Sequence, residues 1–171
     1  TVEADFQRVV PPETSIHSAR MWAVGSSVEV LEEMNHDLDQ CAKHLGSAAV
    51  DIIAYACTGG SLLGGVGFDQ KVKQRISEVA GGIPAVPTAT AVVEALRSLK
   101  IQKVSVVTPY PDDINESLRA FLEGSGFEVL GLFGRGHTLN LDIGADTPET
   151  ILSFAKQYLN PEADGMFLSC T

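Results

Sequence analysis

Short apolar runs alternate with amphipathic stretches along the chain, and this alternation constrains the fold more than any other feature of the sequence. Asp51–Tyr55 (DIIAY) and Lys103–Val107 (KVSVV) are runs of the kind that lie buried on both faces of a sheet. Strands that alternate with helical patterns of about 10–15 residues are typical of βαβ units. We therefore predict an α/β fold in which helices cover both faces of a parallel sheet.

The elements that this pattern predicts can be placed along the chain. The predicted strands cover Ile16–Met21, Asp51–Tyr55, Ile83–Val86, Lys103–Val107, Phe127–Phe133 and Gly165–Leu168. The predicted helices cover Ser26–Leu45, Asp69–Ala80, Thr88–Leu99 and Asp113–Glu123, and another helix begins at Thr147 and Pro148. Ser26 and Glu29 form a capping-box pair at the start of the first helix. Thr58–Gly67 and Gly134–Asp146 are predicted loops.

One internal repeat predicts the domain organisation. Asp51–Thr58 (DIIAYACT) aligns without a gap on Asp164–Thr171 (DGMFLSCT), 113 residues later, and each copy is a buried strand that runs into its carboxyl end. The repeat predicts two similar lobes, residues 1–99 and residues 100–171, of which the second is incomplete. Two full units would need 226 residues against the 171 present, so we expect about 15 further residues before the chain and about 40 after it.

Charge narrows the classes of partner that we expect, and cysteine content narrows the cellular compartment. The net charge of −10 comes from 12 Lys and Arg against 22 Asp and Glu, and it argues against nucleic acids and anionic membrane surfaces. No run of 18 apolar residues occurs, so we expect no membrane-spanning helix. The three cysteines are an odd number and do not form a disulfide framework, which suggests a reducing compartment and a cytoplasmic location.

Motifs for common cofactors are not found in the sequence. The glycine-rich segment after Cys57 is not followed by Gly-Lys-Ser or Gly-Lys-Thr, and no clear GxGxxG occurs, so we expect no nucleotide. The four histidines, which are His17, His36, His44 and His137, show no ligand spacing, and there is no CxxC pair. We therefore predict that the protein uses neither a metal nor another cofactor.

Reactive side chains follow the predicted strands at their carboxyl ends, where ligands bind in open parallel sheets. Cys57, Tyr110 and Cys170 all lie there, and a pseudo-twofold arrangement of two lobes would bring the two cysteines to opposite sides of one cleft. A thiol near a helix N-terminus has a lowered pKa, so we expect thiolate at neutral pH. Thr58 and Ser61 lie in the glycine-rich loop, whose hydroxyls and backbone N–H groups suit a carboxylate.

Other polar residues have plainer interpretations. Cys41 belongs to the apolar stripe of the 26–45 helix and is expected to be structural. Arg135 and His137 could contact an anion, but a solvated loop is the simpler expectation. Asp112 and Asp113 are expected to cap a helix rather than to act as acid or base.

Several motifs together resemble one known superfamily. The chain resembles the aspartate/glutamate racemase superfamily, in the branch that holds maleate cis–trans isomerases and arylmalonate decarboxylases. The resemblance covers nearly the whole chain. Its most specific pieces are Tyr55–Ser61 (YACTGGS), Ile83–Ala91 (IPAVPTATA), Val107–Tyr110 (VTPY) with Asp112–Glu116 (DDINE), and Leu168–Thr171 (LSCT).

The resemblance implies a fold and a site. It implies two flavodoxin-like lobes that bracket a cofactor-free site, in which two cysteines act on the carbon next to a carboxylate. Cys57 and Cys170 match those catalytic cysteines. Tyr110 matches a family tyrosine, and Thr58, Ser61 and Thr171 match groups that hold carboxylate oxygens. The family's opening strand, with its Pro-Ser-Ser-Asn ending, has no counterpart in this chain.

The resemblance leaves the reaction open between branch members. The decarboxylases carry glycine at the first cysteine position, so Cys57 favours an isomerase, whereas Tyr110–Glu116 is closer to the decarboxylases. We predict a cofactor-independent isomerase of a small carboxylic acid, most similar to maleate cis–trans isomerase, which converts maleate to fumarate. The alternatives are an amino-acid (aspartate/glutamate or hydantoin) racemase, an arylmalonate-type decarboxylase and a non-catalytic carboxylate-binding protein. A homo-oligomer through the 26–45 and 88–99 helices is possible but not required.

Overall fold

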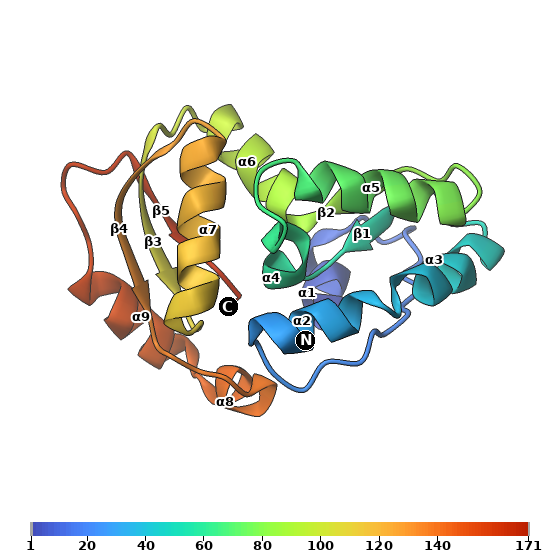
Figure 1. Cartoon of the computed structure of the whole chain (residues 1–171), viewed down its shortest axis with the longest axis horizontal. Helices are drawn as coiled ribbons and strands as arrows, with labels where there is room; N and C mark the ends of the chain where they lie inside the picture. Colours follow the sequence, from blue (N-terminus) through green and yellow to red (C-terminus); the bar gives the residue numbers. More distant parts are fainter. Residues whose placement is uncertain (1, 171) are drawn as a thin grey trace.

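The computed structural model describes residues 2–170 and contains two parallel sheets on opposite sides of the molecule (Figure 1). The smaller sheet pairs β1 (Ile53–Tyr55) with β2 (Ala85–Pro87), and Ile53 lies opposite Ala85. The larger sheet has the order β4-β3-β5, with β3 (Lys103–Thr108) between β4 (Glu128–Gly134) and β5 (Gly165–Leu168). The predicted α/β fold with two parallel-stranded lobes is confirmed.

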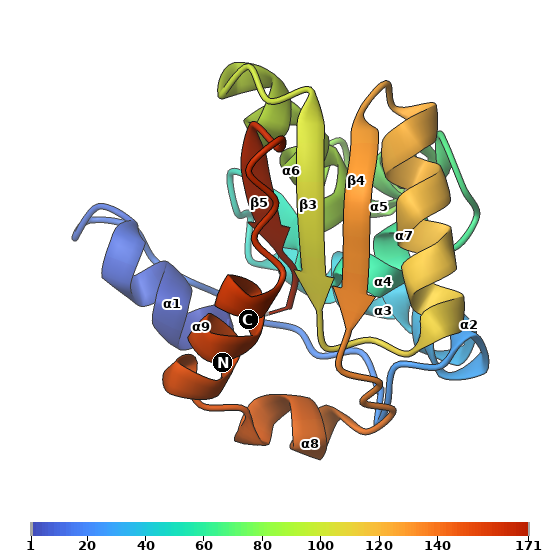
Figure 2. The same ribbon diagram turned by 90° about the vertical axis from the view of Figure 1, so that its left-hand side faces the viewer.

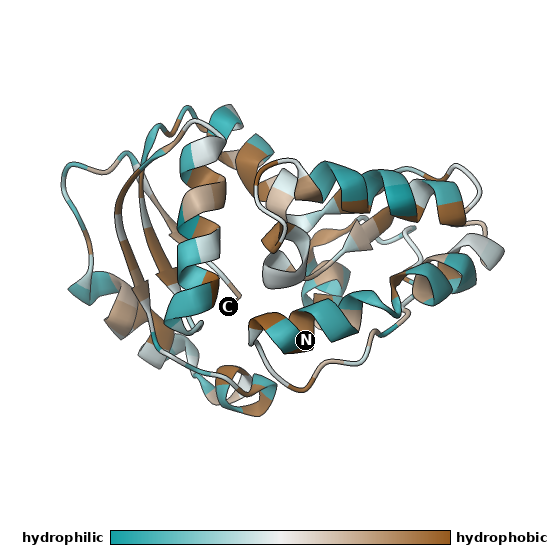
Figure 3. Ribbon diagram, viewed as in Figure 1, coloured by the Kyte–Doolittle hydropathy of each residue, from teal (hydrophilic) through white to brown (hydrophobic). Residues whose placement is uncertain are grey.

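The helices around the smaller sheet form the first hydrophobic core. They are α2 (Val28–Asn35), α3 (Leu38–Ser47), α4 (Thr58–Leu62) and α5 (Phe68–Val79), and α1 (Val2–Val9) precedes them. Leu31 and Met34 on α2 pack with Ile76 on α5 and with Tyr55 on β1, because each helix turns its apolar stripe toward the sheet. In Figure 3 hydrophilic residues mark the outward turns of α2 and α5.

The larger sheet lies between helices on both faces. Val104 and Val106 face a second core that includes residues of α6 (Thr88–Ser98) and α7 (Asp112–Gly124). On the opposite face α9 (Pro148–Gln157) lies in front of the end of β5 and leaves β3 and β4 in view, as Figure 2 shows. A short helix, α8 (Asn140–Ala145), connects β4 to α9. Thr147 caps α9 through its side chain and Pro148 lies in its first turn, as the sequence predicted.

The two cores share residues from both halves of the chain. Leu62 lies on α4 but is completely buried in the second core, while Tyr110 and Ile114 come from the second half and are buried in the first core. α4 therefore packs against both α2 and α7. This exchange brings the ends of β1 and β3 to the same region of the molecule.

A second connection joins the halves far from the covalent link. Residues 22–26 and 137–140, here called the crossing segments, meet at an antiparallel bridge between Gly25 and Leu139. Ser26 N donates to Thr138 O at 3.0 Å and Ser26 Oγ donates to His137 O at 2.8 Å. Figure 1 shows this contact beside α8, at the opposite edge from α6.

Several predicted elements differ from the structure. Ile16–Met21 forms no strand: half of its residues are exposed, and no strand within residues 2–170 pairs with it. The predicted 26–45 helix is divided at His36 and Asp37, where the Asp37 carboxylate accepts a hydrogen bond from Trp22 N at 2.9 Å. Its cap is Ser27, whose side chain accepts from Val30 N, so the predicted capping box of Ser26 and Glu29 is wrong.

Three helices lie where the sequence predicted none. α1 precedes the first predicted element, α4 occupies the first part of the predicted 58–67 loop, and α8 lies within the predicted 134–146 loop. Of these, α4 bears most directly on the site, because it begins directly after Cys57.

Candidate active site

Three reactive side chains occupy equivalent positions at the carboxyl ends of three strands. Cys57 follows the last residue of β1 by two positions, Tyr110 follows the last residue of β3 by two, and Cys170 follows the last residue of β5 by two. Parallel strands direct their carboxyl ends to the same edge of a sheet. The exchange of residues between the cores then brings the two sheet edges toward each other.

Cys57 is the N-cap residue of α4. Its Sγ accepts a hydrogen bond from Gly60 N at 3.4 Å, as a serine or threonine oxygen does at other helix N-termini. Burial nevertheless raises the pKa of the Cys57 thiol to about 11, because loss of solvation, with a smaller contribution from the charge of Cys170, outweighs the stabilising Gly60 hydrogen bond. The expectation of a lowered pKa is therefore wrong: a single turn of buried helix does not offset desolvation.

Cys170 lies at the end of the described chain in a strained backbone conformation, with φ of 55°. The residue as a whole is exposed, yet burial of the thiol is the main reason why its pKa is raised. A hydrogen bond with Tyr110 acts in the opposite direction. Both thiols are therefore predominantly protonated in the ligand-free protein.

Tyr110 is electrostatically coupled to both cysteines. Its phenol accepts a hydrogen bond from Ser169 Oγ at 3.2 Å and is buried, and burial raises its pKa well above the ordinary value. Charges on Cys170 and on Cys57 would both raise the pKa of Tyr110. Cys57 packs against the core that contains Tyr110, and Ser169, which bonds the Tyr110 hydroxyl, directly precedes Cys170. The three side chains therefore form one cluster with a neutral phenol as a potential hydrogen-bond donor.

The turn that carries Tyr110 is fixed by buried hydrogen bonds. Thr108 Oγ1 donates to Asn115 Oδ1 at 2.6 Å and accepts from Tyr110 N at 3.1 Å, while Asn115 Nδ2 donates to Tyr110 O at 3.0 Å. Asn115 therefore holds both ends of the turn from the first part of α7. A rigid turn keeps the phenol in place without help from a ligand.

The predicted carboxylate-binding residues differ in their surroundings. Thr58 begins α4, is partly buried, and has a hydroxyl without a hydrogen-bond partner among residues 2–170. The Ser61 side chain is completely buried, and its hydroxyl donates to Thr58 O at 2.9 Å and accepts from Ala89 N at 3.1 Å. Ser61 thus joins α4 to the start of α6, and its contact with a substrate stays a prediction. Thr171 lies outside the described residues.

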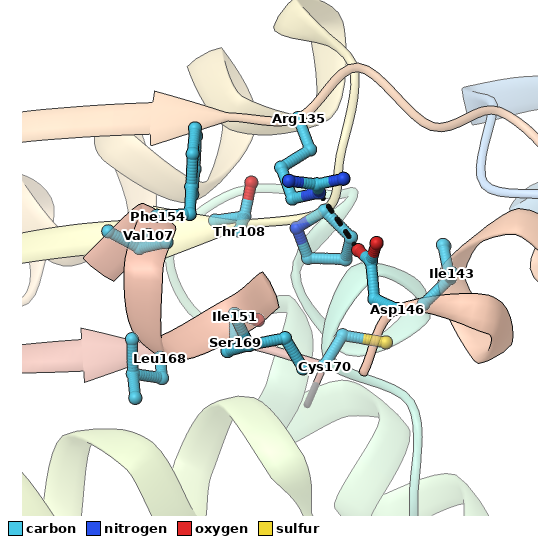
Figure 4. A pocket seen from close by; sticks show the side chains of 11 residues that line it. Val107, Thr108, Arg135, Ile143, Asp146, Ile151, Phe154, Leu168, Ser169 and Cys170 are labelled. Atoms are coloured by element: carbon cyan, nitrogen blue, oxygen red, sulfur yellow. Dashed lines mark ion pairs between the residues drawn. The ribbon is translucent and has the colours of Figure 1, made fainter. Parts of the chain in front are cut away.

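A small cavity of about 20 Å³ opens beside Cys170 and includes neither Cys57 nor Tyr110 in its wall (Figure 4). Arg135 and Asp146 lie in that wall, with Arg135 Nε 2.9 Å from Asp146 Oδ2. His137 Nε2 lies 3.2 Å from the same oxygen, and the Arg135 guanidinium lies over the Phe154 ring at 5.5 Å. Arg135 and Asp146 therefore form a partly buried ion pair beside His137, which the loop sequence alone did not indicate.

No group of three potential metal-binding side chains gathers anywhere in residues 2–170. Within the same residues no helix combines the length and the apolar character that crossing a membrane requires.

The comparison with known proteins decides the family. Residues 10–171 match the arylmalonate decarboxylase (Amdase) family. The chain belongs to the arylmalonate decarboxylase family. This membership confirms the resemblance that the sequence motifs indicated, including the branch that contains maleate isomerases.

Curated relatives of this Amdase-family chain carry two activities. It is 33% identical over 162 residues to the maleate isomerase of Nocardia farcinica, covering 92% of this chain and 64% of the relative. It is 28% identical over 165 residues to the maleate isomerase of Geobacillus stearothermophilus, covering 94% and 66%. The arylmalonate decarboxylase of Bordetella bronchiseptica is 29% identical over 134 residues, covering 75% and 54%. The chain thus spans less than two thirds of the length of these relatives.

Solved structures support the same placement within the Amdase family. A cysteine-to-serine mutant of the Nocardia farcinica maleate cis–trans isomerase, with a covalently bound succinylcysteine intermediate, superposes with a TM-score of 0.92 and 30% identity, covering 97% of this chain and 71% of that chain. A cysteine-to-alanine mutant of the Pseudomonas putida maleate isomerase, with maleate, gives a TM-score of 0.88 at 27% identity, covering 95% and 67%.

Proposed function

We propose that the protein containing this chain is a cofactor-independent cis–trans isomerase that converts maleate to fumarate with Cys57 and Cys170. The observation that carries the proposal is the electrostatic cluster of two thiols and one phenol at equivalent strand ends. Two cysteines favour isomerisation because one can add to the alkene while the other handles the proton. The succinylcysteine intermediate of the Nocardia relative supports a thioether on the reaction path.

The reaction begins when the Cys57 thiol loses its proton to solvent and becomes a thiolate. Sγ adds to one alkene carbon, a C–S bond forms, and the π electron pair moves to the neighbouring carbon and its carboxylate. The Cys170 thiol donates its proton to that carbon and becomes a thiolate. In the resulting succinyl thioether the two former alkene carbons share a single bond, which rotates.

The second half of the reaction reverses these transfers. The Cys170 thiolate removes the proton from the carbon to which it had been given, the electron pair re-forms the double bond, and the C–S bond breaks. Fumarate leaves, and the Cys57 thiolate and Cys170 thiol are restored. Once the Cys57 thiolate has formed, atoms and charges balance without a further acid, base or oxidant.

The neutral groups around the thiols have a role in this scheme. As the carbanion forms, negative charge spreads onto a carboxylate, and preorganised donors stabilise such charge in a buried site. Tyr110 is suited to this role because burial keeps its phenol protonated. Thr58 and Thr171 are proposed to hold carboxylate oxygens, and Ser61 is proposed to act by holding α4 in place.

Proton NMR of the purified protein with maleate tests the proposal. We expect fumarate to accumulate with wild-type protein and the rate to fall at least ~100-fold for Cys57→Ser and for Cys170→Ser, the scale of a positioned acid–base group. Cys41→Ser is the matched control, because Cys41 lies on α3 away from the cluster, and it should retain the wild-type rate. Full isomerase activity of Cys57→Ser would overturn the assignment of the nucleophile.

A decarboxylase is the second candidate, since the chain belongs to the arylmalonate decarboxylase family and its residues 110–116 are similar to that branch. Release of carbon dioxide from an α-aryl-α-methylmalonate, together with no fumarate from maleate, would favour it over the isomerase. A racemase would instead incorporate solvent deuterium at Cα of an amino acid or hydantoin without net conversion.

A further inference from the structure

A chain of three hydrogen bonds runs from the first core to the Cys57 thiol. Tyr55 OH on β1 donates to Asn35 Oδ1 at 2.5 Å, Asn35 Nδ2 donates to Gly60 O at 3.2 Å, and Gly60 N donates to Cys57 Sγ at 3.4 Å. Asn35 is the last residue of α2, so the chain joins three elements that are separate in sequence. None of the predicted site residues except Cys57 belongs to it.

The orientation of the Asn35 amide is fixed by its partners. A carbonyl oxygen can only accept a hydrogen bond, so the Asn35 atom that faces Gly60 O must be the NH₂ group. The other atom is then the amide oxygen, and the Tyr55 hydroxyl must be the donor. Tyr55 is buried, and burial raises its pKa, so its proton remains available for this bond at any pH near neutral.

Close packing around Gly60 makes the position of the Cys57 thiol depend on the position of Asn35. A Cβ on Gly60 would overlap Tyr55 Oη, would lie 2.6 Å from Met34 Cε and would lie 3.3 Å from Cys57 Sγ. A Cβ on Gly59 would lie 2.7 Å from Leu31 Cδ1. The backbone of α4 therefore rests directly on α2 and β1, and glycine is required for this close approach.

We propose that Asn35 and Tyr55 are positioning residues for Cys57, which hold α4 so that the Gly60 N–H points at the sulfur that becomes the nucleophile. This inference rests on the proposed role of Cys57. A hydrogen bond to a thiolate is stronger than one to a thiol, so the positioned N–H stabilises the reactive form selectively. The titratable groups that act on Cys57 from other elements are Tyr55, Tyr110 and Cys170, and none of them supplies this donor.

Two variants and one matched control test the proposal. Tyr55→Phe removes only the hydroxyl, and Asn35→Ser shortens the side chain so that neither bond can form. Tyr158→Phe is the control, because it removes the same atom from a partly buried tyrosine that stacks on Phe133 at the far face of the larger sheet. Each protein is alkylated with iodoacetamide from pH 7 to pH 10.5, and mass spectrometry follows the peptide that contains Cys57.

We expect the alkylation rate of Cys57 at a given pH to fall about 3–10-fold in Tyr55→Phe and Asn35→Ser, because the thiolate loses an aligned donor. With maleate as substrate, kcat should fall about 10-fold while KM stays within about twofold, since the lost interaction belongs to the nucleophile and not to substrate binding. Tyr158→Phe should match wild type in both measurements.

The outcomes separate this inference from the proposed function. If alkylation of Cys57 is unchanged in both variants while thermal unfolding shows that they remain folded, Asn35 and Tyr55 have only a structural role and the proposal is wrong. If the wild-type protein does not isomerise maleate, the alkylation profiles still decide whether the pair positions Cys57. If Tyr55→Phe does not fold, Asn35→Ser provides the same comparison.

Discussion

At the scale of single residues, the reactivity of Cys57 is set by two opposing effects. Loss of solvation disfavours the thiolate, and the Gly60 N–H stabilises it. With a pKa of about 11, about 1 in 10⁴ Cys57 side chains is a thiolate at pH 7. The position of Cys57 could be predicted because a strand end is visible in the sequence. The direction of its pKa shift could not, because the residues that bury the thiol come from several elements of the first core.

The N-cap position of Cys57 makes a prediction for Cys57→Ser. Serine is among the best N-cap residues, and its oxygen accepts from the same backbone N–H. We expect this variant to be as stable as wild type or more stable by up to about 1 kcal/mol, although it lacks isomerase activity. Urea unfolding followed by circular dichroism measures the difference, and a loss of more than about 1 kcal/mol would contradict the capping role.

The raised pKa of Cys57 predicts how stability depends on pH. The folded protein holds this proton up to a pKa of about 11, whereas the unfolded chain releases it near 9.0. The contribution of the protonated Cys57 thiol to stability is therefore fully present below pH 9. As pH rises through 11, this contribution is lost and the unfolding free energy falls by about 2–3 kcal/mol. Tyr55 and Tyr110, whose pKa values are also raised by burial, act in the same direction at higher pH.

Urea unfolding between pH 8 and pH 11 checks this dependence, with Cys57→Ser as the control that lacks the thiol. The control should lose less stability over the same interval. Equal losses in both proteins would show that Cys57 is not the group responsible.

At the scale of elements, α4 is the part of the site that the sequence did not predict. Its sequence, Thr-Gly-Gly-Ser-Leu, has low helix propensity and is typical of a loop. The helix forms because Gly59 and Gly60 allow close packing on Leu31, Met34 and Tyr55, which compensates for the propensity. In contrast, α5, α6 and α7 were predictable because their apolar stripes recur at helical spacing.

Close packing of α4 predicts the effect of Gly60→Ala. The added methyl group would meet Tyr55, Met34 and Cys57, so we expect a loss of about 1–3 kcal/mol in unfolding free energy and a lower isomerisation rate. Gly144→Ala on α8 is the matched control, because a Cβ there meets no atom within 4 Å. The control should be neutral or slightly stabilising, as expected for glycine-to-alanine changes in an exposed helix.

At the scale of the whole molecule, neither half of the chain completes its own core. Leu62 of the first half is buried in a core that includes Val104 and Leu118 of the second half. Tyr110 and Ile114 of the second half are buried among residues of the first. The internal repeat predicted two lobes but could not show this exchange, because local periodicity says which face is buried and not which element buries it. For the same reason the contact between the crossing segments was not predictable from the sequence.

The shared cores predict that both sheets unfold together. Leu62→Ala should cost about 2–5 kcal/mol, the usual range for a buried leucine. Native-state hydrogen exchange should then accelerate by a similar factor in the amides of β1 and of β3, since one cooperative unit opens as a whole. Acceleration confined to one sheet would instead show that the halves unfold independently.

The crossing segments also determine the order in which this fold can be completed on the ribosome. The N–H of Ser26 and the carbonyl of Val24 are synthesised early, but their partners at Thr138 and Asn140 follow more than a hundred residues later. At about 5–20 residues per second this interval lasts roughly 6–23 s. During that time the segment before α2, with the exposed Trp22 and Val24, lacks its contacts with residues 137–140 and is open to chaperones.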